Sequence, residues 1–258
     1  MDTTCCIFIG GKQLGVNCLK RLLEKNIRPQ WVMGNPDDLN EDNIYHDSLL
    51  KFALGEKLEI IRDKKLSDPV FIDSLKKIQP EIIFCIGGTR LIPKEILEIP
   101  SLGCINIHPA LLPKYRGRYS TAHAIINGEI ETGVTLHWMD EGIDSGPIIS
   151  QESIAIEPSD TAKNLWDNFT IEGEKLFVNF LELWLSGNPI HSQTQDESLA
   201  TYYSKALPNE GIIDWSWSGE KIRNFIRAMT FEPFPPVQIE IGNKTMVIVD
   251  EKYYTGPK

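Results

Sequence analysis

The chain lacks several features that would assign it to a protein class at once. No apolar run approaches the ~18 residues needed to cross a membrane, and no basic segment precedes the first apolar stretch. We therefore expect neither a membrane span nor a secretory signal. Low-complexity segments, internal repeats and heptad arrays are also missing, so we expect neither a fibrous nor a solenoid protein.

Cysteine is scarce, and its spacing shows no pairing. The five cysteines are odd in number, have no CxxC pattern and mostly lie inside apolar runs such as CCIFIG and IIFCIGG. Zinc sites need paired ligands, and disulfides need an oxidising compartment. We therefore expect buried reduced thiols, no metal site and a cytoplasmic protein.

Positive charge is in short supply as well. The chain has 26 Lys and Arg residues against 36 Asp and Glu residues, which gives a net charge of −10. Such a chain repels phosphate backbones unless its basic residues gather on one face. We therefore expect no bulk binding of nucleic acid.

Short runs rich in Ile, Val and Phe recur along the first 190 residues, with helix-like segments between them. These runs are apolar without alternation, which is typical of strands covered on both faces of a parallel sheet. The sequence thus predicts an α/β fold with a doubly wound, mostly parallel sheet. The expected strands are 4–10, 30–34, 58–61, 81–88, 103–108 and 133–139. The expected helices include 14–26 and 159–185, the latter with Ser159 or Asp160 as N-cap.

The sequence changes in character after residue 190. A polar connection that contains proline leads to a predicted short helix, 218–229, and to a predicted hairpin, 237–249, with Gly242 and Asn243 in its turn. This region is too small for a core of its own. We therefore expect one large domain over 1–190 and a small region over 191–258 that packs on it or forms a homodimer interface.

Polar side chains follow the fifth apolar run. Asn106 and His108 lie at its carboxyl end, where open parallel sheets bind ligands, and strand alternation points both to the same side. A loop punctuated by glycines follows the sixth run and carries Asp140 and also Asp144, 36 positions after His108. A carboxylate from this loop can orient His108, as a third group does in catalytic sites. An isolated Asn-x-His pattern is more often a turn-forming Asn beside a core histidine. The acidic loop that follows is the feature that favours a catalytic site.

Two stretches, INIHPALLPKYRG (105–117) and GVTLHWMDEGIDSGPIISQ (133–151), resemble the paired signature of the folate-dependent formyltransferases. Weaker similarity runs from the FIGG start to GIIDW and IRNFIRA near the end. The resemblance implies that Asn106, His108 and Asp144 are catalytic, and that N10-formyltetrahydrofolate donates a formyl group to an amine without a metal. Asn106 is suited to stabilise the oxyanion of the tetrahedral intermediate, while His108 or Asp144 takes the proton of the amine.

The same resemblance implies two binding regions. The folate would lie against the loop after the fourth run and against the acidic loop, held largely by the backbone of Ile86, Gly88, Arg90, Leu91, Ile92 and Asp140. A nucleotide needs a stacking face and cations, for which the candidates are Lys12, Tyr119, Lys205, Arg227 and Phe231. Ordinary packing or a solvated charge explains each nucleotide candidate equally well, and core packing explains Leu91 and Ile92 equally well.

Among the subfamilies, the enzymes that modify nucleotide-linked amino sugars fit best, because the chain is acidic and its C-terminal region is compact. We therefore expect a dimeric, cytoplasmic sugar-nucleotide N-formyltransferase acting on a dTDP-linked 3- or 4-amino-dideoxyhexose for lipopolysaccharide O-antigen synthesis. Its catalytic domain would be 1–190, and 191–258 would serve dimerisation and substrate contact.

Alternatives from other classes remain open. A methionyl-tRNA formyltransferase is disfavoured by the acidic charge, and a folate- or nucleotide-binding protein without turnover by the intact catalytic set. Lys12 occupies a position that the dinucleotide motif GxGxxG reserves for glycine, and no HxH or HExxH spacing suggests a metal site. His137, inside the sixth run, is expected to pack in the core or at the sheet edge.

Overall fold

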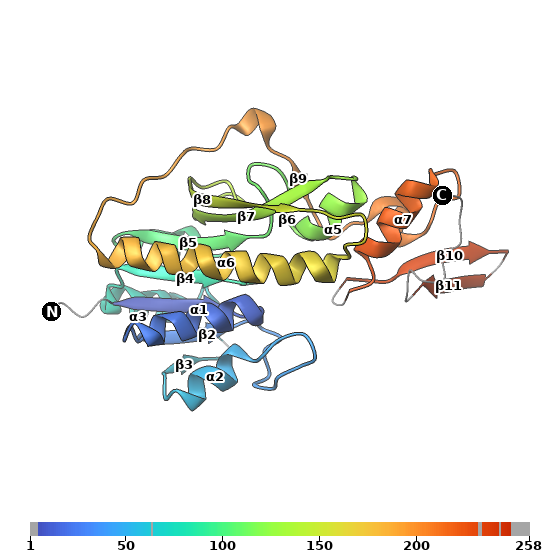
Figure 1. Ribbon diagram of the computed structural model, residues 1–258. Coiled ribbons are helices and arrows are strands. Elements are labelled where there is room, and N and C mark those ends of the chain that lie inside the picture. The colour runs from blue at the N-terminus through green and yellow to red at the C-terminus, as the bar shows by residue number, and fades with distance from the viewer. Residues whose placement is uncertain (1–4, 63, 232–233, 243, 249–258) are drawn as a thin grey trace. The chain divides into compact units, whose positions relative to one another are not determined.

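The computed structural model describes residues 5–62, 64–231, 234–242 and 244–248 of the chain. A seven-stranded sheet with the order β3-β2-β1-β4-β5-β7-β8 dominates it (Figure 1). Its strands are β1 (Cys6–Gly10), β2 (Trp31–Gly34), β3 (Ile60–Ile61), β4 (Ile82–Ile86), β5 (Gly103–His108), β7 (Glu131–Trp138) and β8 (Ile148–Ala155). The first five strands of this order run parallel, and β7 runs antiparallel to β5. The predicted fold class, a mostly parallel α/β sheet, is confirmed.

Helices connect these strands, as the alternating sequence pattern predicts. They are α1 (Lys12–Glu24), α2 (Leu49–Gly55), α3 (Pro69–Ile78), α4 (Lys94–Leu97), α5 (Ser120–Ile126), α6 (Ala162–Leu185) and α7 (Gly219–Ala228). Two short 3-10 helices, Glu197–Leu199 and Pro208–Gly211, and two short strands, β6 (Arg116–Gly117) and β9 (Tyr202–Tyr203), complete the part before the C-terminal hairpin.

The central strands bury side chains on both faces, which explains their unbroken apolar runs. On one face, Phe84 of β4 contacts three aromatic rings of α6, those of Phe177, Phe180 and Trp184. Figure 1 shows α6 lying along β4 and β5. On the other face, alternate residues of the same strands form an apolar cluster with α3 and α4, which includes Ile7, Ile9, Ile83, Cys85, Cys104, Phe71, Leu75 and Ile96. All five cysteines are free, and four of them are buried.

Helix starts follow the capping rules of the sequence. Ser218 caps α7 by accepting a hydrogen bond from the backbone of Lys221, at the start we predicted. The start of α6 differs from the prediction. The Oγ1 of Thr161 accepts from the backbone N–H of Asn164, and Asn164 Oδ1 accepts in return from the backbone N–H of Thr161. This reciprocal pair moves the cap one or two residues past Ser159 and Asp160.

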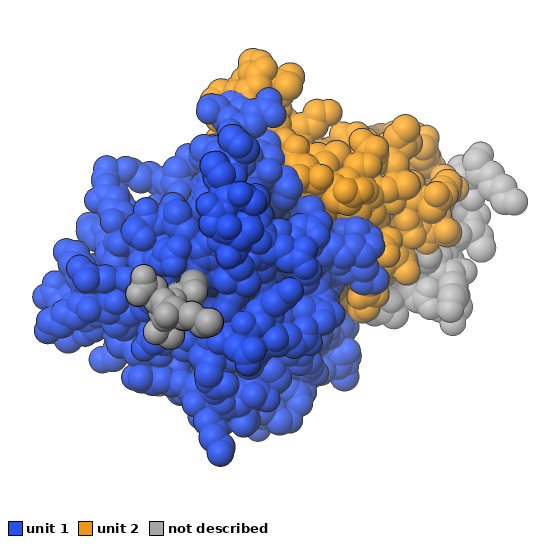
Figure 2. All heavy atoms as spheres, turned by 60° about the vertical axis from the view of Figure 1, so that its left-hand side comes forward, with its two compact units in different colours: residues 1–108, 135–150, 170–195 blue, residues 109–134, 151–169, 196–258 orange. Residues whose placement is uncertain are grey.

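Two compact units emerge from the contacts between residues (Figure 2). Unit 1 contains 1–108, 135–150 and 170–195, and unit 2 contains 109–134, 151–169 and 196–258. The unit boundaries cut β7, β8 and α6, so the units interleave along the sequence. The sequence instead predicts a single boundary at residue 190, and that division stays a prediction.

The C-terminal hairpin lies in unit 2. Its strands, β10 (Val237–Ile241) and β11 (Lys244–Ile248), pair antiparallel at the position we predicted, and Gly242 has the positive φ of 60° that the turn needs. Asn243 lies outside the described residues. In the described part of the chain, no helix combines the length and the apolar character needed to span a membrane.

Candidate active site

The fifth strand and its neighbour β7 bring four polar side chains to one face of the sheet. Asn106 lies opposite His137 in the antiparallel register, and His108 lies opposite Thr135. Directly opposed residues share a face, and so do residues two apart on one strand. Cys104, two residues before Asn106, packs in the cluster with α3. The four polar side chains therefore point to the α3 side of the sheet.

Asp144 joins this group from the loop after β7. Its Oδ2 lies 3.3 Å from Nδ1 of His108, and its Oδ1 lies 3.4 Å from Nδ2 of Asn106. His108 is buried, with 4% of its surface exposed, and the Asp144 side chain is 15% exposed. The structure thus brings together all three side chains that the sequence analysis singled out as catalytic.

The loop reaches His108 in a way that the sequence does not indicate. We expected Asp144 to come from the carboxyl end of a strand that ends beside β5. Because β7 is antiparallel, its last residue Trp138 lies opposite Ile105, near the start of β5. The loop then turns back, and Asp144 takes a left-handed conformation with φ 53°.

His137 packs in the core, as we expected, with 1% of its surface exposed, but its place beside Asn106 was not predicted. Its Nδ1 donates to the carbonyl oxygen of Trp138 at 2.7 Å, and its Nε2 lies 3.3 Å from Nδ2 of Asn106. Burial lowers the pKa of His137 to about 4, with nearby His108 acting in the same direction and Asp144 opposing both. At neutral pH the ring is therefore uncharged, its Nδ1 carries the proton, and its Nε2 accepts from Asn106. The register of β5 against β7 is the only signal that would have placed it here.

The loop predicted to face a folate, 86–92, is held in place by hydrogen bonds between its backbone and the side chain of Asn35. Asn35 accepts from the backbone N–H of Thr89 at 3.0 Å and donates to the carbonyl oxygen of Gly87, also at 3.0 Å. Gly87 has φ 64°, and a Cβ there would lie 2.2 Å from the Gly11 carbonyl oxygen, so only glycine fits this turn. Beyond Gly87, Gly88 is exposed, as is Leu91 at 75%. Asn35 was not singled out by the sequence analysis.

The other folate candidates differ in exposure. Ile86 is fully buried, and its carbonyl accepts from Gly11. Ile92 packs against the α3 cluster, and Arg90 donates to the carbonyl of Lys64 at 2.9 Å. Asp140 is exposed, and its Oδ1 accepts from the backbone of Gly142 and from the hydroxyl of Ser145. These contacts shape the acidic loop.

The predicted nucleotide contacts divide into exposed and buried residues. Lys12 in unit 1 pairs with the exposed Asp37 at 3.4 Å. In unit 2, Lys205 is exposed, and the half-buried ring of Tyr119 contacts that of Phe234. These three stay predictions.

Arg227 and Phe231 do not support the roles we predicted for them. Arg227 is 5% exposed and donates to Asn224 Oδ1 and to the carbonyls of Glu157 and Asp160. These bonds engage its guanidinium inside unit 2. Phe231 is 6% exposed and packs against Trp166, so its faces are covered by protein.

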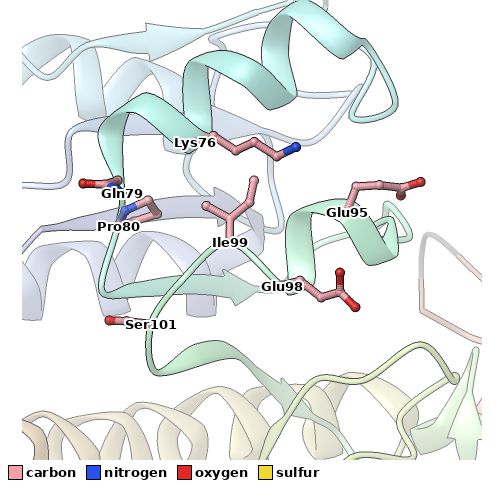
Figure 3. A pocket seen from close by; sticks show the side chains of 7 residues that line it. All are labelled: Lys76, Gln79, Pro80, Glu95, Glu98, Ile99 and Ser101. Atoms are coloured by element: carbon pink, nitrogen blue, oxygen red, sulfur yellow. The ribbon is translucent and has the colours of Figure 1, made fainter.

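A surface hollow in unit 1 lies away from this group (Figure 3). It has a volume of about 660 Å³, and Figure 3 shows Lys76, Glu95 and Glu98 around it. Two of its lining residues, Pro80 and Ser101, lie two positions before the first residues of β4 and β5. The hollow is therefore at the amino ends of these strands, whereas His108 ends β5, and we do not associate it with the candidate active site.

Comparison with known proteins places this geometry in a family. A family model described as "Formyl transferase" matches residues 7–181, more than half of the chain. The chain belongs to the formyl transferase family. A second model, "Formyl transferase, C-terminal domain", matches residues 205–256 of this formyl transferase.

Three relatives illustrate the range of the family. The chain is 36% identical over 239 residues to the bifunctional polymyxin resistance protein ArnA of Wigglesworthia glossinidia brevipalpis, covering 93% of this chain but only 36% of ArnA. It is 35% identical over 252 residues to the methionyl-tRNA formyltransferase of Thermodesulfovibrio yellowstonii, covering 97% of this chain and 80% of that protein. The crystal structure of the N-formyltransferase from Helicobacter canadensis with folinic acid and dTDP-3-aminofucose has a TM-score of 0.78 at 26% identity, covering 95% of this chain and 86% of that one.

The group in this formyl transferase combines three chemical capacities. The carboxamide of Asn106 is a hydrogen-bond donor, and the Asp144 carboxylate is an acceptor. The imidazole of His108 directs Nδ1 to Asp144, which turns Nε2 away from that carboxylate. An imidazole and a carboxylate in such contact can move a proton, and a fixed amide can stabilise a developing negative oxygen. In the described residues, no group of His, Cys, Asp and Glu is arranged to hold a metal ion.

Proposed function

We propose that this chain transfers a formyl group from N10-formyltetrahydrofolate to the amine of a nucleotide-linked amino-deoxy sugar. The observation that carries the proposal is that Asn106 and His108, at the end of β5, each lie within 3.4 Å of Asp144 in a chain of the formyl transferase family. Acyl transfer to an amine needs an oxyanion donor and a proton acceptor, and this group offers both.

Each residue has a role that its contacts support. One N–H of Asn106 stays on His137. The other, which lies 3.4 Å from Asp144 in the resting protein, turns to the oxygen of the formyl carbon as negative charge develops there, an effect typically worth about 3–4 kcal/mol in the transition state. The orientation of Asn106 is set by neutral His137. His108 and Asp144 together take the proton that the attacking amine loses and return one to the leaving nitrogen.

The loops beside this group suit a flat donor with polar edges. Exposed Gly88 and Leu91 offer backbone groups and an apolar surface, and Asn35 holds their loop in shape. On the acidic loop, Ile143 is 48% exposed. These features support a folate donor, because a pterin ring binds through apolar contact and in-plane hydrogen bonds.

A sugar nucleotide is the acceptor that the observations favour. The Helicobacter canadensis enzyme with its dTDP-linked amino sugar covers 95% of this chain. The net charge of −10 opposes a polyanion such as tRNA, whose binding requires several phosphates to be neutralised. We propose Lys12, Tyr119 and Lys205 as contacts of the nucleotide, and a dTDP-linked 3- or 4-amino-dideoxyhexose as the sugar, for surface polysaccharide synthesis in the cytoplasm.

Methionyl-tRNA is the second candidate acceptor. It is favoured by the 35% identity to the methionyl-tRNA formyltransferase of Thermodesulfovibrio yellowstonii, which extends over 97% of this chain. The two acceptors differ strongly in charge. Binding of tRNA should therefore weaken steeply with added salt, whereas binding of a sugar nucleotide should weaken only modestly.

A direct assay separates the candidates. The protein is incubated with N10-formyltetrahydrofolate and either a panel of dTDP- and UDP-linked amino sugars or charged initiator tRNA. We expect the mass of one sugar nucleotide to rise by one formyl group, with no formylation of the tRNA. Product from the tRNA alone would replace the proposal by the second candidate. Folate binding without any product would indicate a binding protein that lacks turnover.

The proposal includes a homodimer formed by the hairpin. Ile239, Ile241 and Met246 share one face of β10 and β11, and Ile241 and Met246 are 58% and 52% exposed. A two-stranded ribbon with an exposed apolar face is marginal alone and gains stability by pairing with a second copy. Light scattering at micromolar concentration should give the mass of a dimer, and a monomer mass would remove this part of the proposal.

A further inference from the structure

A short segment after α6 lies against the loop that carries Asp144. The backbone of Gln193 exchanges two hydrogen bonds with that of Ile148, each 2.8 Å long, as in an antiparallel bridge. All of these residues belong to unit 1. The bridge brings Gln195 beside the turn 144–146.

Gln195 uses its amide group on this turn. Its Nε2 donates to the carbonyl oxygen of Asp144 at 2.8 Å and to that of Gly146 at 2.7 Å. The residue is only 5% exposed. Gln195 therefore donates both amide hydrogens to backbone oxygens of the candidate active-site loop.

The turn needs such support because its backbone is strained. Asp144 has φ 53°, a conformation that costs a non-glycine residue roughly 1–2 kcal/mol. Gly146 approaches Trp138 so closely that a Cβ would lie 1.9 Å from the Trp138 carbonyl oxygen. Two hydrogen bonds of normal length, at about 1 kcal/mol each, are enough to offset the strain at Asp144.

We propose that Gln195 is a positioning residue, which holds Asp144 in the left-handed conformation that presents its carboxylate to Nδ1 of His108. Without the two bonds, the Asp144 backbone relaxes toward negative φ, and the carboxylate leaves the ring. The kinetic side of this inference rests on the proposed function, whereas the contact between Asp144 and His108 can be tested without turnover.

The test replaces Gln195 by methionine, which has a similar length and no donor. Protein labelled with ¹⁵N-histidine is studied by NMR, and the His108 signals are assigned through their loss in the His108→Asn variant. In the wild-type protein we expect a downfield proton on Nδ1 of His108, held by Asp144. In Gln195→Met we expect that signal to disappear or to broaden. Gln193→Met is the matched control, because Gln193 lies in the same segment and is exposed, and its His108 spectrum should match the wild type.

Kinetics with the formyl acceptor give the second readout. Misplacing a catalytic group by about 1 Å can cost 100-fold, so we expect kcat of Gln195→Met to fall about 10- to 100-fold while KM changes less than about 3-fold. A purely structural role would lower the melting temperature and the amount of folded enzyme but leave kcat per folded molecule and the His108 signal unchanged. That result would overturn the proposal.

A shorter substitution covers the case in which methionine prevents folding. Gln195→Asn keeps the carboxamide but is one methylene short of both carbonyls, so the same loss of signal and of kcat is expected. If this folded variant kept the wild-type His108 spectrum, Gln195 would not position Asp144. A wild-type protein with no formyl transfer at all would refute the proposed function instead, and the NMR comparison would still decide the role of Gln195.

Discussion

Two networks of polar side chains, one chosen from each unit, differ in the length of their hydrogen bonds. In unit 1, the contacts among Asn106, His108, His137 and Asp144 measure 3.3, 3.3, 3.4 and 3.7 Å. In unit 2, Tyr115 donates to Glu129 at 2.7 Å, and Asn127 donates to the hydroxyl of Tyr203 at 2.7 Å and to that of Tyr115 at 3.2 Å. The first network is held loosely, and the second is held at normal bond length.

The difference separates groups that do chemistry from groups that hold the fold. Catalytic hydrogen bonds are often long before substrate binds and tighten during the reaction. A structural network gains its stability in the resting protein, so its bonds are short from the start. The backbone that carries Asp144 resembles the structural network instead, since Gln195 donates to its carbonyl oxygens at 2.7 and 2.8 Å. The networks should therefore respond oppositely to substitution.

The largest effect is expected from Asp144→Asn. Asparagine has the same shape but cannot take a proton, so we expect kcat/KM to fall about 100- to 10,000-fold. The melting temperature should change little, because the long bonds of this network add little stability. Asp167→Asn serves as the control, because that carboxylate is 53% exposed and pairs with Lys163 on the surface. A fall in kcat/KM of less than about tenfold for Asp144→Asn would show that the long contacts of unit 1 do not mark catalytic groups.

Arg227→Met should show the opposite pattern. The substitution removes the Arg227 donor from the carbonyl of Asp160 and from Oδ1 of Asn224, whereas the carbonyl of Glu157 keeps the backbone N–H of Asp160. Each buried group without a partner costs roughly 1–3 kcal/mol, so we expect unfolding in urea to show a loss of about 3 kcal/mol or more. Arg223→Met is the matched control on α7, where Arg223 is exposed, and it should change stability by less than about 0.5 kcal/mol. Equal effects from both variants would remove the structural role of Arg227.

The sequence predicts the parts of the site that belong to one strand. Asn106 and His108 lie two residues apart at the end of β5, and the period of two is enough to place them on one face. The positions of the central sheet strands are also predictable, because unbroken apolar runs report burial on both faces. Features set by local pattern were therefore predicted well.

Features that depend on distant parts of the chain were not predicted. The direction of β7 is invisible in its sequence, so His137 was not expected beside Asn106. Arg227 was a candidate phosphate ligand because a diphosphate needs cations. Its partners at 157 and 160 lie about 70 positions away and could be found only from the fold. The strand β8, whose burial is uneven, was missed for the same reason.

His137 allows a sharper test of the first network through pH. Its pKa in the folded chain is about 4, below the ordinary value of ~6.5 that it regains on unfolding. Between these values the unfolded chain binds a proton that the folded chain does not, so stability falls as the pH drops from 6.5 to 4, by about 3 kcal/mol in total.

The measurement compares the free energy of unfolding of the wild type and of His137→Gln across this range. We expect the free energy of unfolding of the wild type, relative to that of His137→Gln, to fall by about 3 kcal/mol between pH 7 and pH 4. Burial also lowers the pKa of His123, which adds the same trend to both proteins and cancels in the difference. His191→Gln, at an exposed histidine, should leave the pH dependence unchanged. If the difference in unfolding free energy between the two proteins did not vary with pH, His137 would have the same pKa in the folded and the unfolded chain.

The smallest effect is expected from Glu129→Gln in the second network. Glutamine can still accept from the hydroxyl of Tyr115, so only the charge of the bond is lost, and stability should fall by less than about 1 kcal/mol. Because this network supports the fold of unit 2, kcat/KM should stay within about twofold of the wild type. Glu131→Gln is the control, since that exposed carboxylate accepts only a 3.1 Å bond from Ser153 in the described contacts. A fall in kcat/KM beyond about tenfold with unchanged stability would mean that short bonds, too, can belong to groups that act on the substrate.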